Sequence, residues 1–264
     1  VDQTDGAKAM SALHLEIHGS TAELCLDNPA KLNALTVQML QALESHCTTI
    51  EKNHDIRAVL LTGEGDRAFC VGADINAWAD LPSENFARHW VRDGHRAIDR
   101  LAHLSLPTIA VISGHAFGGG LELASACDLR VMSPDATLAL PETGVGIVAG
   151  WSGSQRLAKH FPPAVLKEMA LLGRRLTAER AYQIGYANEV ALDAKAAAFA
   201  MADEISGKSP RATEVTKYMI QAVLGENSNA MIEALGGGMI FATEDKAEGV
   251  ASFREKRKPK FPGK

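Results

Sequence analysis

The chain has 264 residues, of which 46% are hydrophobic and 22% are charged, and its formal net charge is -5. This composition excludes an intrinsically disordered chain, and the length is sufficient to bury a core. No stretch approaches the roughly 20 apolar residues that a membrane-spanning helix needs, so no membrane partner is expected. The pI near 6.0 argues against a general nucleic-acid binder.

The cysteines indicate neither a metal site nor a disulfide framework. Cys25, Cys47, Cys70 and Cys127 form no CxxC pair and no cluster with histidine at metal spacing. We expect small buried thiols, no metal, and a reducing, cytoplasmic compartment. No secretory signal opens the chain, and Met10 is a candidate start, so residues 1–9 are interpreted as a remnant or a processed end.

The first two-thirds of the chain predicts strands alternating with helices. Thr36 is a suitable N-cap for a helix reaching about Asn53. The apolar face of this helix comprises Met39, Leu40, Leu43, Cys47 and Ile50. Further helices are predicted over 83–103 and from the glycines at 118–120. Strands are predicted as a pair within 13–26 with a turn near Gly19, and at 56–62, 108–112, 128–132 and 137–140.

From Trp151 onward the pattern changes to successive helices, with no strand predicted. Asp193 can cap a helix that ends at Gly207, and Ser209-Pro210 starts one that ends at Gly225. The sequence therefore predicts an α/β chain with a helical last third.

Two catalytic motifs are incomplete. The segment 63–68 fits GxGxxA, but the residues after it make a poor helix start, which disfavours a dinucleotide site. The segment 150–154 lacks the last glycine of a serine-hydrolase elbow, because Ser154 stands there. His115, beside the glycines, is interpreted as structural.

The stretch from Gly114 to Glu122 is more informative. Three glycines at a helix start leave backbone N–H groups open to a developing oxyanion. Glu122 lies three residues after Gly119, on the same face of the predicted helix. Tight helix packing, with Glu122 as a first-turn partner of the dipole, explains this stretch equally well.

A second carboxylate, Glu142, follows the predicted strand at 137–140. Acids at strand ends are commonly turn residues, and that is the favoured interpretation of Glu142 taken alone. If Glu122 and Glu142 converge on one site, their mutual repulsion raises one pKa and makes them a general acid–base pair.

Several segments together resemble the enoyl-CoA hydratases of the crotonase superfamily. They occur in the family's order from about residue 12 to the C-terminus. The matching segments are 28–35 (NPAKLNAL), 68–75 (AFCVGADI), 118–122, 141–142, 153–157 (GSQRL), 244–245 and 253–257 (FREKR).

The resemblance implies a crotonase-like spiral of ββα units, expected over residues 1–195. It also implies a helical C-terminal region, expected over 196–264, that mediates formation of a homotrimer or a dimer of trimers. The partner would be an acyl-CoA thioester, and no cofactor is needed because coenzyme A is part of the substrate.

The resemblance also assigns roles to residues. The N–H groups of Ala73 and Gly119 would form an oxyanion hole for the thioester oxygen, and Glu122 and Glu142 would be the catalytic pair. The coenzyme A site would comprise Ala30, Leu32, Ala73, Asp74, Ile75 and Gly119, with Phe253 and Lys256 at its adenine and 3′-phosphate end. For most charges of the basic tail, solvation remains the favoured explanation.

The presence of both acids favours hydration over the other reactions of the superfamily. Glu122 would help deprotonate water, and Glu142 would deliver a proton to Cα. One alternative is an isomerase or another crotonase reaction. Glu122→Ala would distinguish it, because a hydratase should lose most of its rate whereas a pure isomerase could retain it. The other alternative is a non-catalytic scaffold that binds acyl-CoA or RNA. The stretch 148–152 departs from the usual pattern beside the acyl pocket, where Trp151 is bulky. Chain length and branching of the acyl group therefore stay open.

Overall fold

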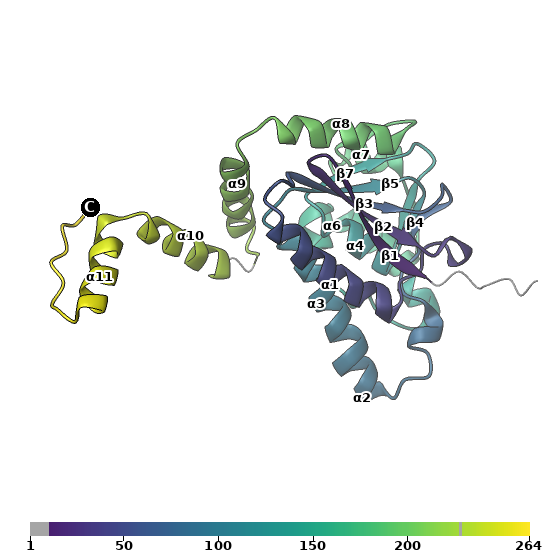
Figure 1. Ribbon diagram of the computed structural model, residues 1–264. Coiled ribbons are helices and arrows are strands. Elements are labelled where there is room, and N and C mark those ends of the chain that lie inside the picture. Colours follow the sequence, from purple (N-terminus) through teal and green to yellow (C-terminus); the bar gives the residue numbers. More distant parts are fainter. Residues whose placement is uncertain (1–10, 227–228) are drawn as a thin grey trace, which may run out of the picture. The chain divides into compact units, whose positions relative to one another are not determined.

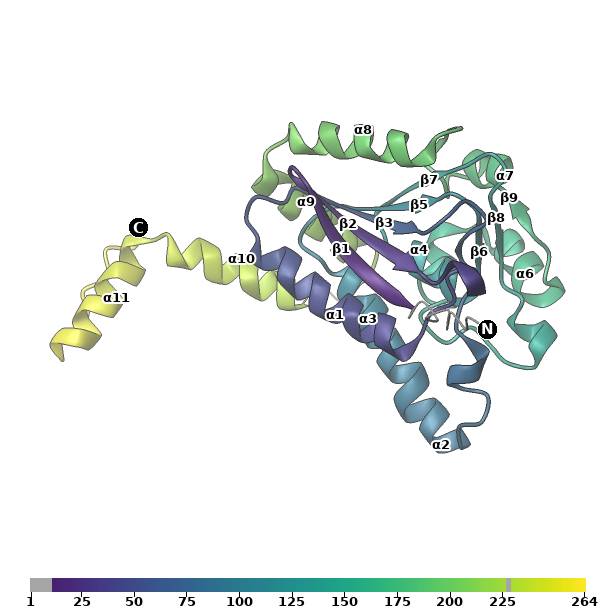
Figure 2. The same cartoon turned by 45° about the vertical axis from the view of Figure 1, so that its right-hand side comes forward.

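A computed structural model describes residues 11–226 and 229–264, and Figures 1 and 2 show it from two directions. The interpretation of residues 1–9 falls outside the described residues. The chain divides into two compact units, Val1–Glu214 and Val215–Lys264.

The strands form two sheets. One has the order β1-β2-β3-β5-β7-β10, and the other has the order β4-β6-β8-β9. The strands are β1 (Ala12–His18), β2 (Thr21–Asp27), β3 (Ala58–Gly63), β4 (Ala68–Cys70), β5 (Thr108–Ile112), β6 (His115–Phe117), β7 (Leu129–Met132), β8 (Thr137–Ala139), β9 (Leu176–Thr177) and β10 (Glu189–Val190).

Helices connect and cover these strands. The first unit contains α1 (Val37–Lys52), α2 (Ser83–Asn85), α3 (Arg92–Ala102), α4 (Gly119–Ala124), α5 (Leu157–His160), α6 (Pro163–Leu172), α7 (Ala178–Gln183) and α8 (Ala194–Ser206). Short 3-10 turns lie at Pro29–Lys31, Ile75–Ala77 and Glu142–Val145. Helix α9 (Pro210–Val223) crosses the division between the units, and α10 (Asn229–Phe241) and α11 (Glu244–Glu255) follow.

The chain winds repeatedly between the two sheets. β3, β5 and β7 pair in parallel in the larger sheet, and each is followed directly by a strand of the smaller sheet, β4, β6 and β8. A helical segment then leads to the next turn. This repetition is the ββα spiral expected from the sequence, and it places the ends of successive strands beside one another.

The larger sheet is covered by helices on both faces. Ala58 and Leu60 of β3 pack with Ala198 of α8, whereas the alternate residues Val59 and Leu61 belong to the main core with α1. Figure 2 shows α8 on one side of this sheet and α1 on the other. Because α8 packs on the sheet, the first compact unit, which ends at Glu214, includes this helix. The boundary at 195 that the resemblance implies stays a prediction.

The predicted cap and apolar face of α1 are confirmed. The Thr36 hydroxyl accepts the Met39 N–H, and all five residues of the predicted apolar face are buried. The strands at 12–27, 58–63, 108–112, 129–132 and 137–139 and the helices at 194–206 and 210–223 also match their predictions. Three of the four cysteines are buried, and Cys25 is half-buried.

Three details differ from the predictions or refine them. Two strands occur after Trp151: β10 extends the larger sheet beside β7, and β9 pairs with β8. Each has only two residues, too few for an alternating pattern. The predicted helix at 83–103 contains a π-helical turn, Phe86–Val91, which buries Trp90.

The first glycine of 63–68 ends β3, and the chain continues into β4. This strand lies where a dinucleotide-binding motif requires the start of a helix. The prediction that segment 63–68 is not a dinucleotide site is therefore confirmed.

Gly120 allows α4 to pack directly on β4. A Cβ at this position would lie 2.0 Å from the Cys70 carbonyl oxygen, and a backbone atom cannot move aside cheaply. We expect Gly120→Ala to lower the free energy of unfolding by about 3 kcal/mol or more, measured by urea denaturation. Gly207→Ala is the control, because its Cβ would make only ordinary contacts beyond 3.4 Å. Equal stability of the two variants would contradict this packing.

The second unit exposes many large apolar side chains, among them Met219, Val223, Ile232, Met239 and Phe241. Among the described residues, no helix has the length and apolarity required to cross a membrane.

Candidate active site

A cavity of about 230 Å³ lies within the first unit. Its wall contains Glu122, Glu142 and backbone of the glycine-rich segments, and most of the remaining side chains are apolar. It is lined by Val71, Gly72, Ala73, Ile75, Trp78, Phe86, Trp90, Val91, Gly118, Gly119, Glu122, Pro141, Glu142, Val145, Ile147, Val148, Gly150 and Trp151. The four predicted catalytic residues, Ala73, Gly119, Glu122 and Glu142, therefore share one cavity.

Two backbone segments meet at this cavity, one at Gly72-Ala73 and one at Gly119. Gly119 is the first residue of α4, so its N–H precedes the first hydrogen bond within the helix. The bridge between Leu35 and Ala73 uses the Gly72 carbonyl and the Asp74 N–H, which directs the intervening Ala73 N–H the other way. Gly72 has φ +101°, and a Cβ there would lie 3.2 Å from the Gly119 nitrogen. Glycine at 72 thus keeps the approach to Gly119 open.

Glu122 projects from α4 and is only 3% exposed. Its Oε1 accepts two backbone N–H groups, from Trp151 at 2.7 Å and from Gly153 at 2.6 Å. Burial raises the pKa of Glu122 to about 7, opposed by these two N–H groups and reinforced by the charge of Glu142. Glu122 can therefore exchange a proton near neutral pH.

Glu142 begins the 3-10 turn that follows β8. Burial raises its pKa, and its own backbone N–H partly offsets this effect. Its Oε2 is buried without a hydrogen-bond partner among the described residues. A Cβ on Gly118 would lie 2.7 Å from Oε1 of Glu142, so glycine at 118 is required for this carboxylate to approach α4.

The raised pKa of Glu122 makes stability depend on pH. Between pH 4.5 and 7 the unfolded chain releases the Glu122 proton while the folded chain retains it, so rising pH lowers the free energy of unfolding. We expect this group to contribute a fall of about 3 kcal/mol across that window. Glu122→Gln should remove the fall, which urea denaturation of both proteins between pH 4.5 and 8 would measure. Parallel pH profiles would contradict the raised pKa.

Apart from Gly119, which begins α4, the predicted coenzyme A residues of the first unit lie on two adjacent loops. The Lys31 ammonium contacts Asp74 at 2.5 Å, and the Val71 N–H donates to the Leu32 carbonyl. The Lys31 contact also lowers the pKa of Asp74. Ala30 and Leu32 are thereby held beside Asp74 and Ile75, and Ile75 also lines the cavity.

The two predicted tail residues belong to the second unit. Phe253 is 85% exposed on α11, and Lys256 is the exposed C-cap of that helix. Their assignment to the adenine and 3′-phosphate end stays a prediction.

The serine-hydrolase alternative gains no support from Ser152. The Ser152 hydroxyl contacts Nδ1 of His95 at 3.1 Å, but Ser152 is buried and is not one of the residues that line the cavity, whose wall at this loop is formed by Gly150 and Trp151. His115 is structural as expected: it contacts the Thr137 hydroxyl and stacks on Phe117.

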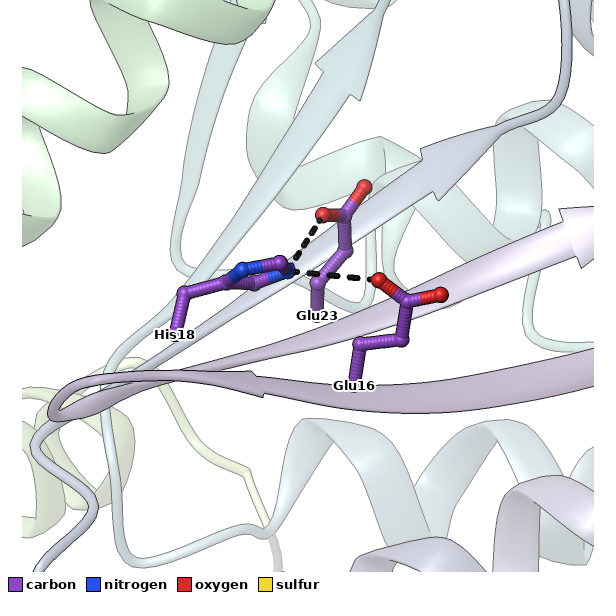
Figure 3. Close-up of side chains that lie close together, drawn as sticks. All are labelled: Glu16, His18 and Glu23. Atoms are coloured by element: carbon purple, nitrogen blue, oxygen red, sulfur yellow. Dashed lines mark ion pairs between the residues drawn. The ribbon is translucent and has the colours of Figure 1, made fainter.

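One cluster outside the cavity combines metal-binding residue types. Figure 3 shows Glu16, His18 and Glu23 on β1 and β2, with Nε2 of His18 facing both carboxylates. Glu23 is buried, and its Oε1 also receives the Thr62 hydroxyl and the Lys195 ammonium. The cluster is thus an ion-pair network that offsets the desolvation cost of the buried Glu23 carboxylate.

Aromatic residues of the cavity were not predicted apart from Trp151. All three tryptophans of the chain, Trp78, Trp90 and Trp151, line it. Trp90 and Trp151 pack with ring centroids 5.3 Å apart. A Cβ on Gly94 would lie 2.2 Å from the Trp151 ring, so this glycine provides the space for it. These residues are scattered in sequence, and no local pattern marks them.

The chain is similar to known proteins over nearly its whole length. Residues 16–264 match the family described as enoyl-CoA hydratase/isomerase. Carnitinyl-CoA dehydratase of Proteus mirabilis is 34% identical, covering 96% of this chain and 99% of the relative. (E)-benzylidenesuccinyl-CoA hydratase of Thauera aromatica is 35% identical, covering 94% and 98%.

The fold agrees as well. The crystal structure of an enoyl-CoA hydratase from Bacillus anthracis superimposes with a TM-score of 0.78 at 30% identity, covering 96% of this chain and 99% of that one. The chain therefore belongs to the enoyl-CoA hydratase/isomerase family and has the crotonase fold.

Proposed function

We propose that the protein reversibly adds water to a trans-2-enoyl-CoA and gives a 3-hydroxyacyl-CoA. The observation that carries the proposal is the pair of buried glutamates, Glu122 and Glu142, on the wall of one apolar cavity beside the Gly119 N–H. The reaction needs no metal and no redox cofactor, because all atoms come from water and the thioester.

The thioester oxygen would accept the N–H groups of Ala73 and Gly119. Attack of water at Cβ pushes negative charge onto this oxygen, and fixed donors stabilise the enolate-like transition state. Loss of one such donor costs about 10²–10³ in rate in comparable sites. Because α4 and the loop at 71–75 hold these groups, little reorganisation accompanies the reaction.

Glu122 and Glu142 would hold the attacking water. Glu122 uses Oε1 for two backbone N–H groups, which leaves Oε2 to take a proton from water as oxygen bonds to Cβ. Glu142 supplies the proton that Cα receives, and proton exchange through the bound water restores both groups. Burial raises the pKa of both acids, and the value of about 7 for Glu122 suits proton transfer near neutral pH.

The remaining assignments concern substrate binding. Coenzyme A would lie along the loops that contain Ala30, Leu32, Asp74 and Ile75. Phe253 and Lys256, from this chain or from a neighbouring chain of the trimer, are the proposed contacts of its adenine end. The acyl chain would enter the apolar part of the cavity, where Val148 and Trp151 form part of the wall.

The test is loss of the conjugated enoyl-thioester absorbance when the protein is mixed with crotonyl-CoA. Rapid loss supports hydration. If crotonyl-CoA is inert, branched and aromatic 2-enoyl thioesters are tested next, because the bulky Trp151 lines the cavity. No loss with any of these thioesters would contradict the proposal, and tight RNA binding without turnover would favour the non-catalytic alternative.

We also propose a homotrimer or a dimer of trimers. Supporting observations are the exposed apolar side chains of α9 and α10, including Val223 at 88% and Met239 at 71% exposure. Sedimentation equilibrium at micromolar concentration should give the mass of three or six chains. A monomer would contradict this assembly.

A further inference from the structure

A ring of hydrogen bonds and ion pairs lies directly behind the two N–H groups that bind Glu122. Ser152 stands between the donors, Trp151 and Gly153. Its φ is +84°, a conformation that is unfavourable for a residue other than glycine. Two N–H groups two residues apart can converge on one oxygen when the residue between them adopts positive φ, which makes an anion-binding concavity of the backbone.

The Ser152 side chain is fixed by α3. Its hydroxyl contacts His95 Nδ1 at 3.1 Å, and His95 Nε2 lies 3.3 Å from Asp99 Oδ2, one helical turn further on. Because the carboxylate only accepts, the imidazole proton belongs on Nε2, and Nδ1 accepts the Ser152 hydroxyl proton.

The ring closes through Arg156. Its guanidinium donates to Asp99 Oδ1 at 2.7 Å, and its backbone N–H donates to the Ser152 carbonyl at 2.8 Å. Ser152 and Arg156 are both more than nine-tenths buried. Ser152 is therefore held at its hydroxyl by α3 and at its carbonyl by the residue that precedes α5.

We propose that Ser152, His95, Asp99 and Arg156 form a positioning device that keeps the Trp151 and Gly153 N–H groups on Glu122 Oε1. This proposal rests on the role of Glu122 as the base. None of the four contacts substrate in this scheme, and all are positioning residues. A reactive serine is unnecessary to explain the contact between Ser152 and His95.

The device has a measurable consequence for Glu122. Two N–H donors stabilise its ionised form, so loosening them raises the pKa of Glu122 further. The charged or titratable groups around it are Glu142, Arg156 and, within the ring, His95 and Asp99. If Glu122 must be ionised to accept a proton, the midpoint of the rise in kcat with pH should move upward.

Ser152→Ala and Ser152→Gly separate the backbone role from the hydroxyl. Alanine loses the hydroxyl and disfavours positive φ, so kcat should fall about 10- to 100-fold, as for a displaced catalytic group. Glycine also loses the hydroxyl but adopts positive φ readily, so it should recover much of the activity. Ser154→Ala is the matched control, because Ser154 is exposed on the same loop.

The titration of Glu122 can be followed without turnover by carbon-13 NMR of the glutamate carboxylates, with Glu122→Gln to assign the signal. We expect a raised midpoint in Ser152→Ala, partial return in Ser152→Gly and no change in Ser154→Ala. His95→Ala, which leaves the loop sequence intact, should raise the midpoint too.

An unchanged midpoint in both Ser152→Ala and His95→Ala would overturn the proposal, as would equal shifts in the Ala and Gly variants. Because this readout needs no substrate, failure of the positioning role is distinguishable from an absence of hydratase activity.

Discussion

Glu122→Gln and Glu142→Gln should each lower kcat for hydration of crotonyl-CoA by about 10²–10⁴-fold, the usual contribution of a general acid or base. Glutamine has nearly the shape of glutamate, and at position 122 its amide oxygen can still accept the N–H groups of Trp151 and Gly153. The loss would therefore report proton transfer rather than a collapsed loop. Steady-state kinetics at pH 7 would measure it.

Glu189→Gln is the control for these variants, because Glu189 is exposed on β10. Its kcat should equal that of the unmodified chain. Retention of most hydration activity in Glu122→Gln, with loss only in Glu142→Gln, would contradict the role of Glu122 in taking the proton from water.

Gly72→Ala should reduce kcat by about 10²–10³-fold, the cost of losing one oxyanion donor. The new Cβ would lie 3.2 Å from both the Gly119 nitrogen and the Phe117 carbonyl oxygen, and φ +101° disfavours alanine. Either the methyl group obstructs the Gly119 N–H or the two backbone segments move apart. In both cases the thioester oxygen loses aligned donors, whereas Glu122 and Glu142 stay in place.

Gly185→Ala provides a matched control for backbone strain. Gly185 has φ +80°, but its Cβ would meet nothing within 4 Å. Both variants should lose stability, measured by urea denaturation, and only Gly72→Ala should lose the rate. Full activity in Gly72→Ala would argue against an oxyanion site at Gly119.

Local chemistry accounts for how well parts of the site could be predicted. The glycines at 118–120 and Glu122 indicated, from a single short segment, either an anion site at the exposed N–H groups of a helix start or tight helix packing. Glu142 was ambiguous alone, because its carboxylate approaches α4 only where it passes Gly118, a residue that follows a different strand. The resemblance to a family supplied that pairing.

Other features depend on distant contacts and had no local signal. Trp78 and Trp90 reach the cavity through a 3-10 turn and a π-helical turn, and Gly94 is needed only because Trp151 packs on it. The ring from Ser152 through His95 joins segments 57 residues apart. Strands β9 and β10 are fixed by their partners rather than by their own two residues.

The most direct test of the central claim, addition of water by the glutamate pair, is isotopic. Crotonyl-CoA would be incubated with the protein in oxygen-18 water and, separately, in deuterium oxide, and the thioester product analysed by mass spectrometry. The account predicts 3-hydroxybutyryl-CoA with oxygen-18 at C3 in the first solvent and deuterium at C2 in the second. Formation of both labelled products should be about 10²–10⁴-fold slower in Glu122→Gln and Glu142→Gln. A product that takes up deuterium but no oxygen-18 would contradict the account, because it would show proton transfer without hydration.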